Sequence, residues 1–153
     1  MAKLRGDTHT LDLLSWEATP IVEAFAPERV RTSSLRSKIA RAVSEAMKDS
    51  DLSRAMIAID MTDWLGEEVT ENMVNAYASE ARDRDTIPYL RLLALVHVTG
   101  DVRLLQMGAE LMGHSVIENK YLNWVDVGRL ADHKETIDKE FNAARRMARM
   151  GVK

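Results

Sequence analysis

The segment SRAMIAIDMTDWLGEEVTENMVNAYAS, residues 53–79, predicts two short helices joined by a turn. Ser53 is placed to cap the first helix and Gly66 to end it, and Thr70 is placed to cap a second helix over residues 71–79. The first helix carries its apolar side chains on one stripe: Ile57, Ala58, Met61 and Leu65. This order of caps, stripe and turn is typical of a helix-turn-helix, so nucleic-acid binding is the first functional hypothesis.

Helices are also predicted on both sides of this pair. Residues 34–49 carry apolar side chains at the helical period of about 3.6 residues. Residues 86–88 begin a fourth helix that Gly100 ends, and Asp101 is placed to cap a fifth helix that Gly113 ends. The sequence therefore predicts an all-α protein with a compact helical core.

Composition divides the chain of 153 residues into three predicted parts. Residues 1–32 contain two of the three prolines and are expected to form an N-terminal arm, which docks either on this chain's own helices or on a partner. Residues 33–115 form the helical domain with the helix-turn-helix. Residues 116–153 contain a long C-terminal helix, expected from about residue 122 to residue 150, without a proline.

The long C-terminal helix carries a narrow apolar stripe. Its members recur at helical spacings: Leu130, Ile137, Phe141, Ala144 and Ala148. A stripe this narrow favours packing against a single helix. We therefore expect a homodimer held by a coiled coil of the C-terminal helices, with packing back on the globular part as the alternative.

Basic residues crowd the start of the helix predicted over residues 34–49: Arg29, Arg31, Arg36, Lys38 and Arg41. The helix macrodipole disfavours cations at that end. A bound phosphate would compensate, because free backbone N–H groups and guanidinium groups would both point at it. The alternative is a solvated face whose cations pair with carboxylates such as Glu28 and Glu45.

The distribution of charge is unfavourable for DNA binding. A net charge of −3 and a sequence pI of about 5.8 are unfavourable for broad, non-specific binding to polyanions. Residues 51–100 contain nine acidic and four basic side chains, although a DNA-reading surface should attract phosphate. The predicted fold and the local charge therefore disagree.

Three stretches resemble the helical DNA-binding domains of phage regulators of the lambda Cro and repressor type: SDLSRAMIAIDMTDWLGEEVTENMVNAYASEARD (50–83), TIPYLRLLALVHVTGD (86–101) and LLQMGAELMG (104–113). They are most similar to small regulatory-looking proteins of Mu-like transposable prophages. In that family pattern Ala58 would be the small residue of the second helix, Gly66 the turn, and the helix from Glu71 the recognition helix. Ala58 and Gly66 lie eight residues apart, a wider spacing than in the usual motif.

The outward side of the third helix would read bases in such a domain: Asn72, Asn75, Ser79 and Arg82. Asparagine can make paired hydrogen bonds to adenine, and arginine can make them to guanine. Simple solvent exposure is the alternative for both asparagines. The resemblance implies a DNA-binding transcriptional regulator of a phage or prophage. The alternative is an adaptor that keeps the helix-turn-helix scaffold but binds a phage or host protein through its acidic third helix.

The sequence contains none of the local motifs that identify common enzyme classes. It has no phosphate-binding glycine loop, no His-Glu-x-x-His run and no nucleophile elbow, and its four histidines are scattered. Without cysteine, disulfides and thiolate metal sites are excluded. We expect no catalysis, no cofactor and no metal. No apolar run approaches the roughly 20 residues that cross a bilayer, so a cytoplasmic location without membrane contact is expected.

Overall fold

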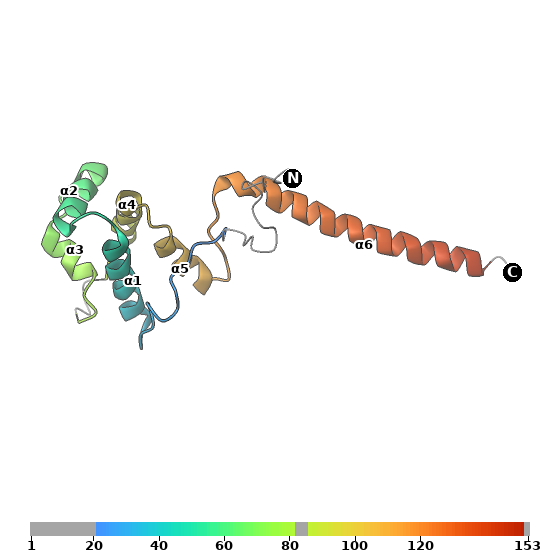
Figure 1. Ribbon diagram of the computed structural model, residues 1–153, viewed down its shortest axis with the longest axis horizontal. Helices are drawn as coiled ribbons and strands as arrows, with labels where there is room; N and C mark the ends of the chain where they lie inside the picture. Colours follow the sequence, from blue (N-terminus) through green and yellow to red (C-terminus); the bar gives the residue numbers. More distant parts are fainter. Residues whose placement is uncertain (1–20, 82–85, 152–153) are drawn as a thin grey trace, which may run out of the picture.

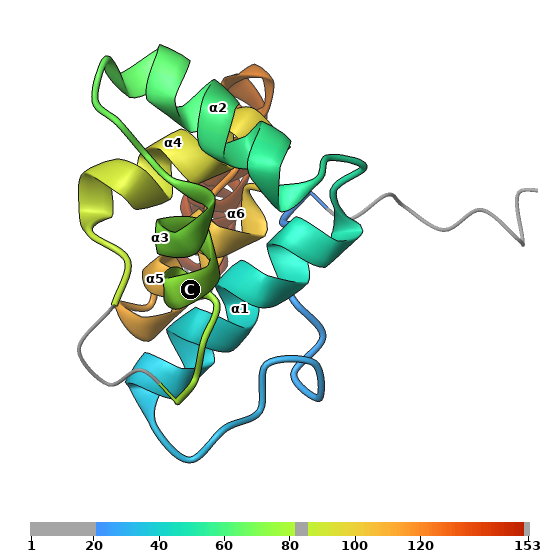
Figure 2. The ribbon, with the colours of Figure 1, turned by 90° about the vertical axis from the view of Figure 1, so that its left-hand side faces the viewer.

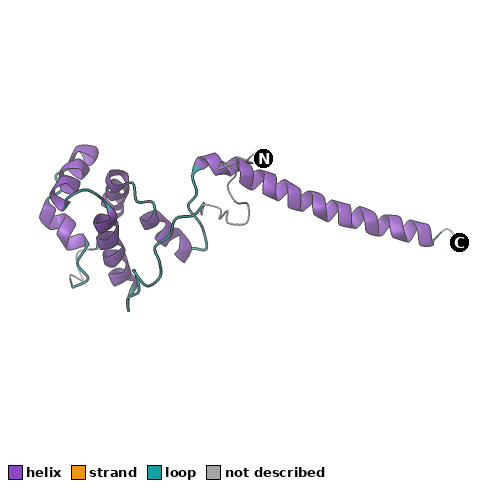
Figure 3. Ribbon diagram, in the orientation of Figure 1, coloured by secondary structure: helices purple, strands orange, loops and turns teal. Residues whose placement is uncertain are grey.

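The computed structural model describes residues 21–81 and 86–151, and this part of the chain contains helices and loops but no strand (Figures 1 and 3). The elements follow in the order α1 (Leu35–Asp49), α2 (Arg54–Leu65), α3 (Glu71–Tyr77), α4 (Tyr89–Thr99), α5 (Arg103–Leu111), the 3-10 turn η1 (Asn119–Tyr121) and α6 (Leu122–Met150). The prediction of an all-α fold is confirmed. Helices α1 to α5 form a body, and α6 projects away from it (Figure 1).

Side-chain caps and left-handed glycines set several helix ends. The hydroxyl groups of Ser34, Ser53 and Thr70 each accept a hydrogen bond from the backbone N–H three residues later, which begins α1, α2 and α3. Gly66 ends α2 with a φ of 69° and Gly100 ends α4 with a φ of 70°. Because a Cβ atom is strained in this conformation, glycine suits both positions. The predicted caps and ends at Ser53, Gly66, Thr70 and Gly100 are confirmed.

Two predicted boundaries are wrong. Helix α3 ends at Tyr77 rather than at Ser79, and its C-cap Ala78 closes it with backbone hydrogen bonds to Val74 and Ala76. Helix α5 has Val102 rather than Asp101 at its N-cap position. The Asp101 carboxylate still accepts the backbone N–H of Arg103, but it also binds the guanidinium group of the same residue.

The core of the body lies where α2 crosses α4. Helix α2 makes its most extensive contacts with α4 and also packs on α3, while α1 contacts α3 and α5 (Figure 2). The largest fully buried side chains come from all five helices of the body: Val43, Ile57, Met61, Val74, Leu95 and Leu104. Burial of each side chain of this size contributes about 1.5–3 kcal/mol. The five short helices are therefore held mainly by their mutual packing rather than by their own helix propensity.

The chain that precedes α1 packs on this core. Phe25 and Val30 are buried in it, and the guanidinium carbon of Arg103 lies 4.4 Å from the centre of the Phe25 ring. For residues 21–32, docking of the predicted arm on the chain's own helices is thus observed. Residues 1–20 lie outside the described part of the chain.

Ion pairs hold the segment before α1 against α1 and α5. Arg29 binds Glu45 and Asp49 at nitrogen–oxygen distances of 2.7 Å each. Asp49 also accepts a hydrogen bond from Arg103 at 2.8 Å, and Arg103 binds Asp101 at 2.6 Å. We call Arg29, Glu45, Asp49, Asp101 and Arg103 the arginine–carboxylate network. Asp49 accepts hydrogen bonds from Arg29, which has the larger effect, and from Arg103, and these hold its pKa well below the ordinary value of 3.8.

The network predicts an acid sensitivity that depends on Asp49. Because the folded-state pKa of Asp49 is depressed, its stabilising contribution is present above about pH 4 and is lost as the pH falls further. Asp49→Asn should lower the free energy of unfolding at pH 7 and reduce its pH dependence below about pH 5, measured by urea unfolding. Asp51→Asn, at an exposed residue outside the network, is the matched control. Equal pH profiles for both variants would contradict the assignment.

Candidate functional site

The turn between α2 and α3 is fastened by one side chain. The Thr62 hydroxyl donates to the Ala58 carbonyl at 2.8 Å and accepts from the Val69 backbone N–H at 2.9 Å. The Val69 side chain is buried in the core. Residues 66–70 thus form a turn anchored at both its backbone and its side chain, although it is longer than the usual turn of this motif. Helix α3 is thereby placed on α2 with a defined orientation.

Among the described residues predicted to contact bases, only Asn72 is an exposed residue of α3. Asn72 is exposed on α3, whereas Asn75 is half-buried and its side-chain oxygen accepts a hydrogen bond from the guanidinium group of Arg54. Ser79 lies beyond the end of α3, in a hollow that Arg36 and Glu80 also line. The prediction of a common helix face is wrong for Ser79 because α3 stops two residues earlier. Arg82 lies outside the described residues.

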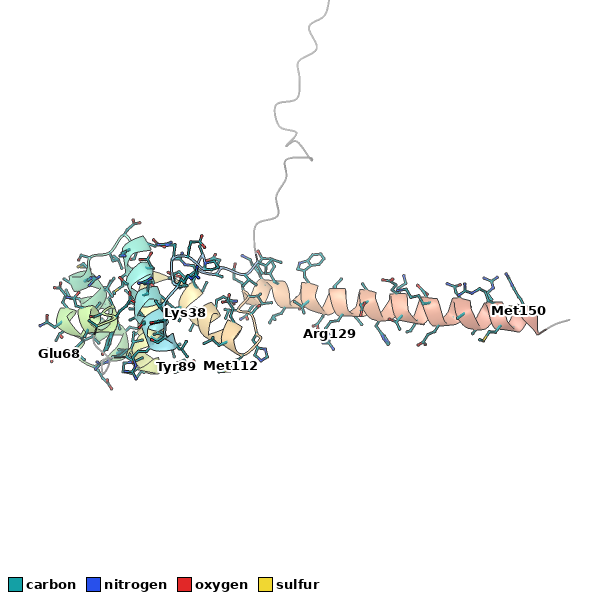
Figure 4. The ribbon with its side chains drawn as sticks, turned by 90° about the horizontal axis from the view of Figure 1, so that it is seen from below. Lys38, Glu68, Tyr89, Met112, Arg129 and Met150 are labelled. Carbon is teal, nitrogen blue, oxygen red and sulfur yellow. The ribbon has the colours of Figure 1, made fainter. Side chains whose placement is uncertain are left out.

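An acidic edge surrounds the start of α3. It consists of Glu67, Glu68 and Glu71, all exposed. Glu68 lies at the end of the body farthest from α6 (Figure 4). Trp64, near the end of α2, is 45% exposed and stacks on His97 with ring centroids 5.1 Å apart. Exposed carboxylates are better suited to a basic protein surface than to a phosphate backbone.

Two of the five predicted phosphate ligands are occupied within the chain. Arg29 belongs to the arginine–carboxylate network, and Arg41 binds Glu80 at 2.8 Å and the Arg31 carbonyl at 2.7 Å. For these two arginines, the alternative interpretation of the sequence is observed: they pair with carboxylates. The Arg29 guanidinium lies at the C-terminal end of α1, against Glu45 and Asp49, rather than at the start of the helix, so internal carboxylates offset the charge of both arginines.

The other three predicted phosphate ligands form no ion pair in the described part of the chain. Arg31 and Arg36 are exposed and Lys38 is half-buried, and none of the ion pairs among residues 21–81 and 86–151 involves them. Lys38 lies nearer to α6 than Glu68 does (Figure 4). We call Arg31, Arg36 and Lys38 the basic cluster. The body thus presents positive charge at the start of α1 and negative charge at the acidic edge.

The residues predicted to mediate dimerisation all lie on α6 and remain uncovered. Leu130, Ile137 and Phe141 are 68%, 50% and 64% exposed, and Ala144 and Ala148 are also exposed. Within the described part of the chain, no residue of α6 is buried. This is an apolar surface without a partner in the described chain.

Two features of α6 escaped the sequence prediction. Val127 extends the apolar stripe by one position toward the N-terminus and is 53% exposed. The last three turns carry Arg145, Arg146 and Arg149, and no acidic residue follows Glu140. The run of basic residues in the sequence is enough to predict this basic end of α6. Cations are favoured at the C-terminal end of a helix by its macrodipole, so the run alone does not define a binding site.

Comparison of the chain with protein-family models, with curated proteins and with solved structures finds no match. Among residues 21–81 and 86–151, no group of three or more histidine and carboxylate side chains is arranged to hold a metal ion. The described helices include none with both the length and the apolar character needed to span a bilayer.

Proposed function

We propose that this chain is a non-catalytic DNA-binding regulator of a phage or prophage that acts in the cytoplasm. The observation that carries the proposal is the basic cluster, whose three cations have no carboxylate partner within residues 21–81 and 86–151. It lies at the N-terminal end of α1, where backbone N–H groups also favour an anion. The phage setting rests on the sequence resemblance alone.

Of the basic cluster, Arg36 lies close to the end of α3, so this arginine and α3 can contact the same duplex. The hollow between α1 and the end of α3 is lined by Arg36, Ser79 and Glu80, and Glu80 also binds Arg41. Phosphate contacts from the basic cluster would position the body, and the exposed Asn72 would contact a base edge. Arg54, held by Asn75, is a further candidate for a base or phosphate contact.

Neutralising the basic cluster tests the proposal. Changing Arg31, Arg36 and Lys38 together to Gln should weaken binding to unrelated DNA sequences about equally. The slope of log affinity against log salt concentration should also fall by about 2–3, since each phosphate contact contributes about 0.9. The measurement is fluorescence anisotropy with labelled duplexes across a salt series.

The matched control removes the same charge far from the body, by changing Lys120, Arg129 and Lys139 to Gln. It should leave the salt slope unchanged. Equal losses in the two triple variants would mean that only net charge matters. No measurable DNA binding by the unaltered protein at low salt would reject the proposal.

The acidic edge favours a second candidate, an adaptor that binds a basic segment of a phage or host protein. Glu67, Glu68 and Glu71 are all exposed, and Trp64, a few residues earlier in the sequence, offers an exposed aromatic side chain. A DNA-binding surface gains nothing from these charges.

Reversal of the acidic edge distinguishes the two candidates. Under the DNA proposal, changing Glu67, Glu68 and Glu71 to Lys should tighten DNA binding by removing repulsion. Under the adaptor candidate, the same variant should lose capture of a basic partner from a lysate of the cells that carry the protein. Reversal of Glu118, Asp132 and Glu135 to Lys, outside the body, controls for charge. A variant that behaves like this control in both assays would remove the acidic edge from either function.

A further inference from the structure

We propose that α6 pairs with α6 of a second copy of this chain as a parallel, in-register, two-stranded coiled coil. This inference concerns assembly and does not depend on DNA binding. Its starting point is a helix of 29 residues in which no side chain is buried against the described part of the chain. Most helical stability in proteins comes from packing of an apolar face, so this helix needs a partner surface.

The apolar stripe of α6 has the spacing of a coiled-coil seam. Successive members lie three and four residues apart in strict alternation: Val127, Leu130, Lys134, Ile137, Phe141, Ala144 and Ala148. In heptad notation Val127, Lys134, Phe141 and Ala148 take the a positions, and Leu130, Ile137 and Ala144 take the d positions. Six of these seven residues are apolar. Such a seam is narrow and continuous, as pairing with a single helix requires.

The charges beside the seam favour two parallel copies. In a parallel pair, a g residue faces the e residue five positions later on the other helix. Glu140 would then face Arg145 of the second copy, and His133 would face Asp138 of the second copy. Each pair occurs twice because of the two-fold symmetry. Both are complementary, one as an ion pair and one as a donor–acceptor pair.

The antiparallel register that packs Phe141 on Ile137 brings like charges together. It would put Glu140 opposite Glu140 of the second copy, and Asp138 opposite Asp138 of the second copy. Like charges at these flanking positions disfavour that arrangement. Lys134 interrupts the seam at one a position, and a single lysine there favours two strands at some cost in stability. Its aliphatic stem can cover the seam while its ammonium group reaches water.

Two neighbouring alanines provide a matched test of the seam. Ala144 lies in the seam and Ala143 lies outside it. Ala144→Glu and Ala143→Glu therefore introduce the same carboxylate on different sides of one helix. Ala144→Glu should weaken the dimer about tenfold or more, because it places a carboxylate between the helices. Ala143→Glu should leave it unchanged, and Lys134→Leu should tighten it. The measurement is the dissociation constant of the full chain by sedimentation equilibrium.

A monomeric full-length protein at tens of micromolar, or equal dissociation constants for the two glutamate variants, would overturn the proposal. A monomer would mean that no second copy covers the stripe. Equal effects of the two variants on a dimer would place the interface elsewhere.

Orientation is tested with single cysteines, because the natural chain has none. In the parallel, in-register dimer, Ala148→Cys places two thiols in one layer, within reach of a disulfide under mild oxidation. In the antiparallel register that packs Phe141 on Ile137, residue 148 lies opposite residue 130. The two thiols would then lie about 27 Å apart along the axis, since the helix rises about 1.5 Å per residue. Ala143→Cys, outside the seam, is the control.

Cross-linking of Ala148→Cys but not of Ala143→Cys supports the parallel arrangement. A mixture of Ala148→Cys and Leu130→Cys proteins that cross-links only between the two variants would overturn it in favour of antiparallel pairing. A dimer in which neither seam variant cross-links, alone or mixed, would overturn the parallel, in-register pairing and exclude this antiparallel register as well.

Discussion

The uncovered apolar stripe of α6 is the strongest constraint on how this chain assembles. A helix of 29 residues projects from the body without one buried side chain, and its most apolar positions, Leu130 and Phe141, are 68% and 64% exposed. An exposed apolar seam of this length marks an interaction surface. A second copy satisfies both the heptad spacing and the flanking charges. Parallel pairing would hold two bodies at the same end of the coil, where they can meet neighbouring sites on one duplex.

The body has its own core without α6, so the stability of the body and the pairing of α6 can be tested separately. Its core is formed by α1 to α5, and the arginine–carboxylate network fastens residues 25–30 to α1 and α5. Ion pairs within the chain also divide the five predicted phosphate ligands into two groups. Arg29 and Arg41 are held by carboxylates, whereas Arg31, Arg36 and Lys38 have no such partner among the described residues. The proposed phosphate contacts are therefore fewer than the sequence predicted.

Local signals made the helical fold predictable, whereas contacts between distant residues did not follow from sequence. Ser53, Gly66 and Thr70 act within three or four residues of their own positions, so their roles can be read directly. Arg29 meets Asp49 across 20 residues, Arg54 meets Asn75 across 21, and Arg41 meets Glu80 across 39. No sequence pattern predicts such pairs, because each depends on how the helices pack against one another. The end of α3 at Tyr77 was missed because neither glycine nor proline marks it.

The pairing of α6 can be tested by amide hydrogen exchange of the full-length protein, first at a concentration at which the proposed dimer forms and then after dilution. We expect the backbone amides of residues 127–148 to be protected in the dimer and to lose that protection in the monomer, because only a second copy would cover the seam. The amides of α1, α2 and α4 should keep their protection in both states, since their core lies within one chain. Equal protection of α6 in monomer and dimer, or rapid exchange of α6 in both, would contradict the account.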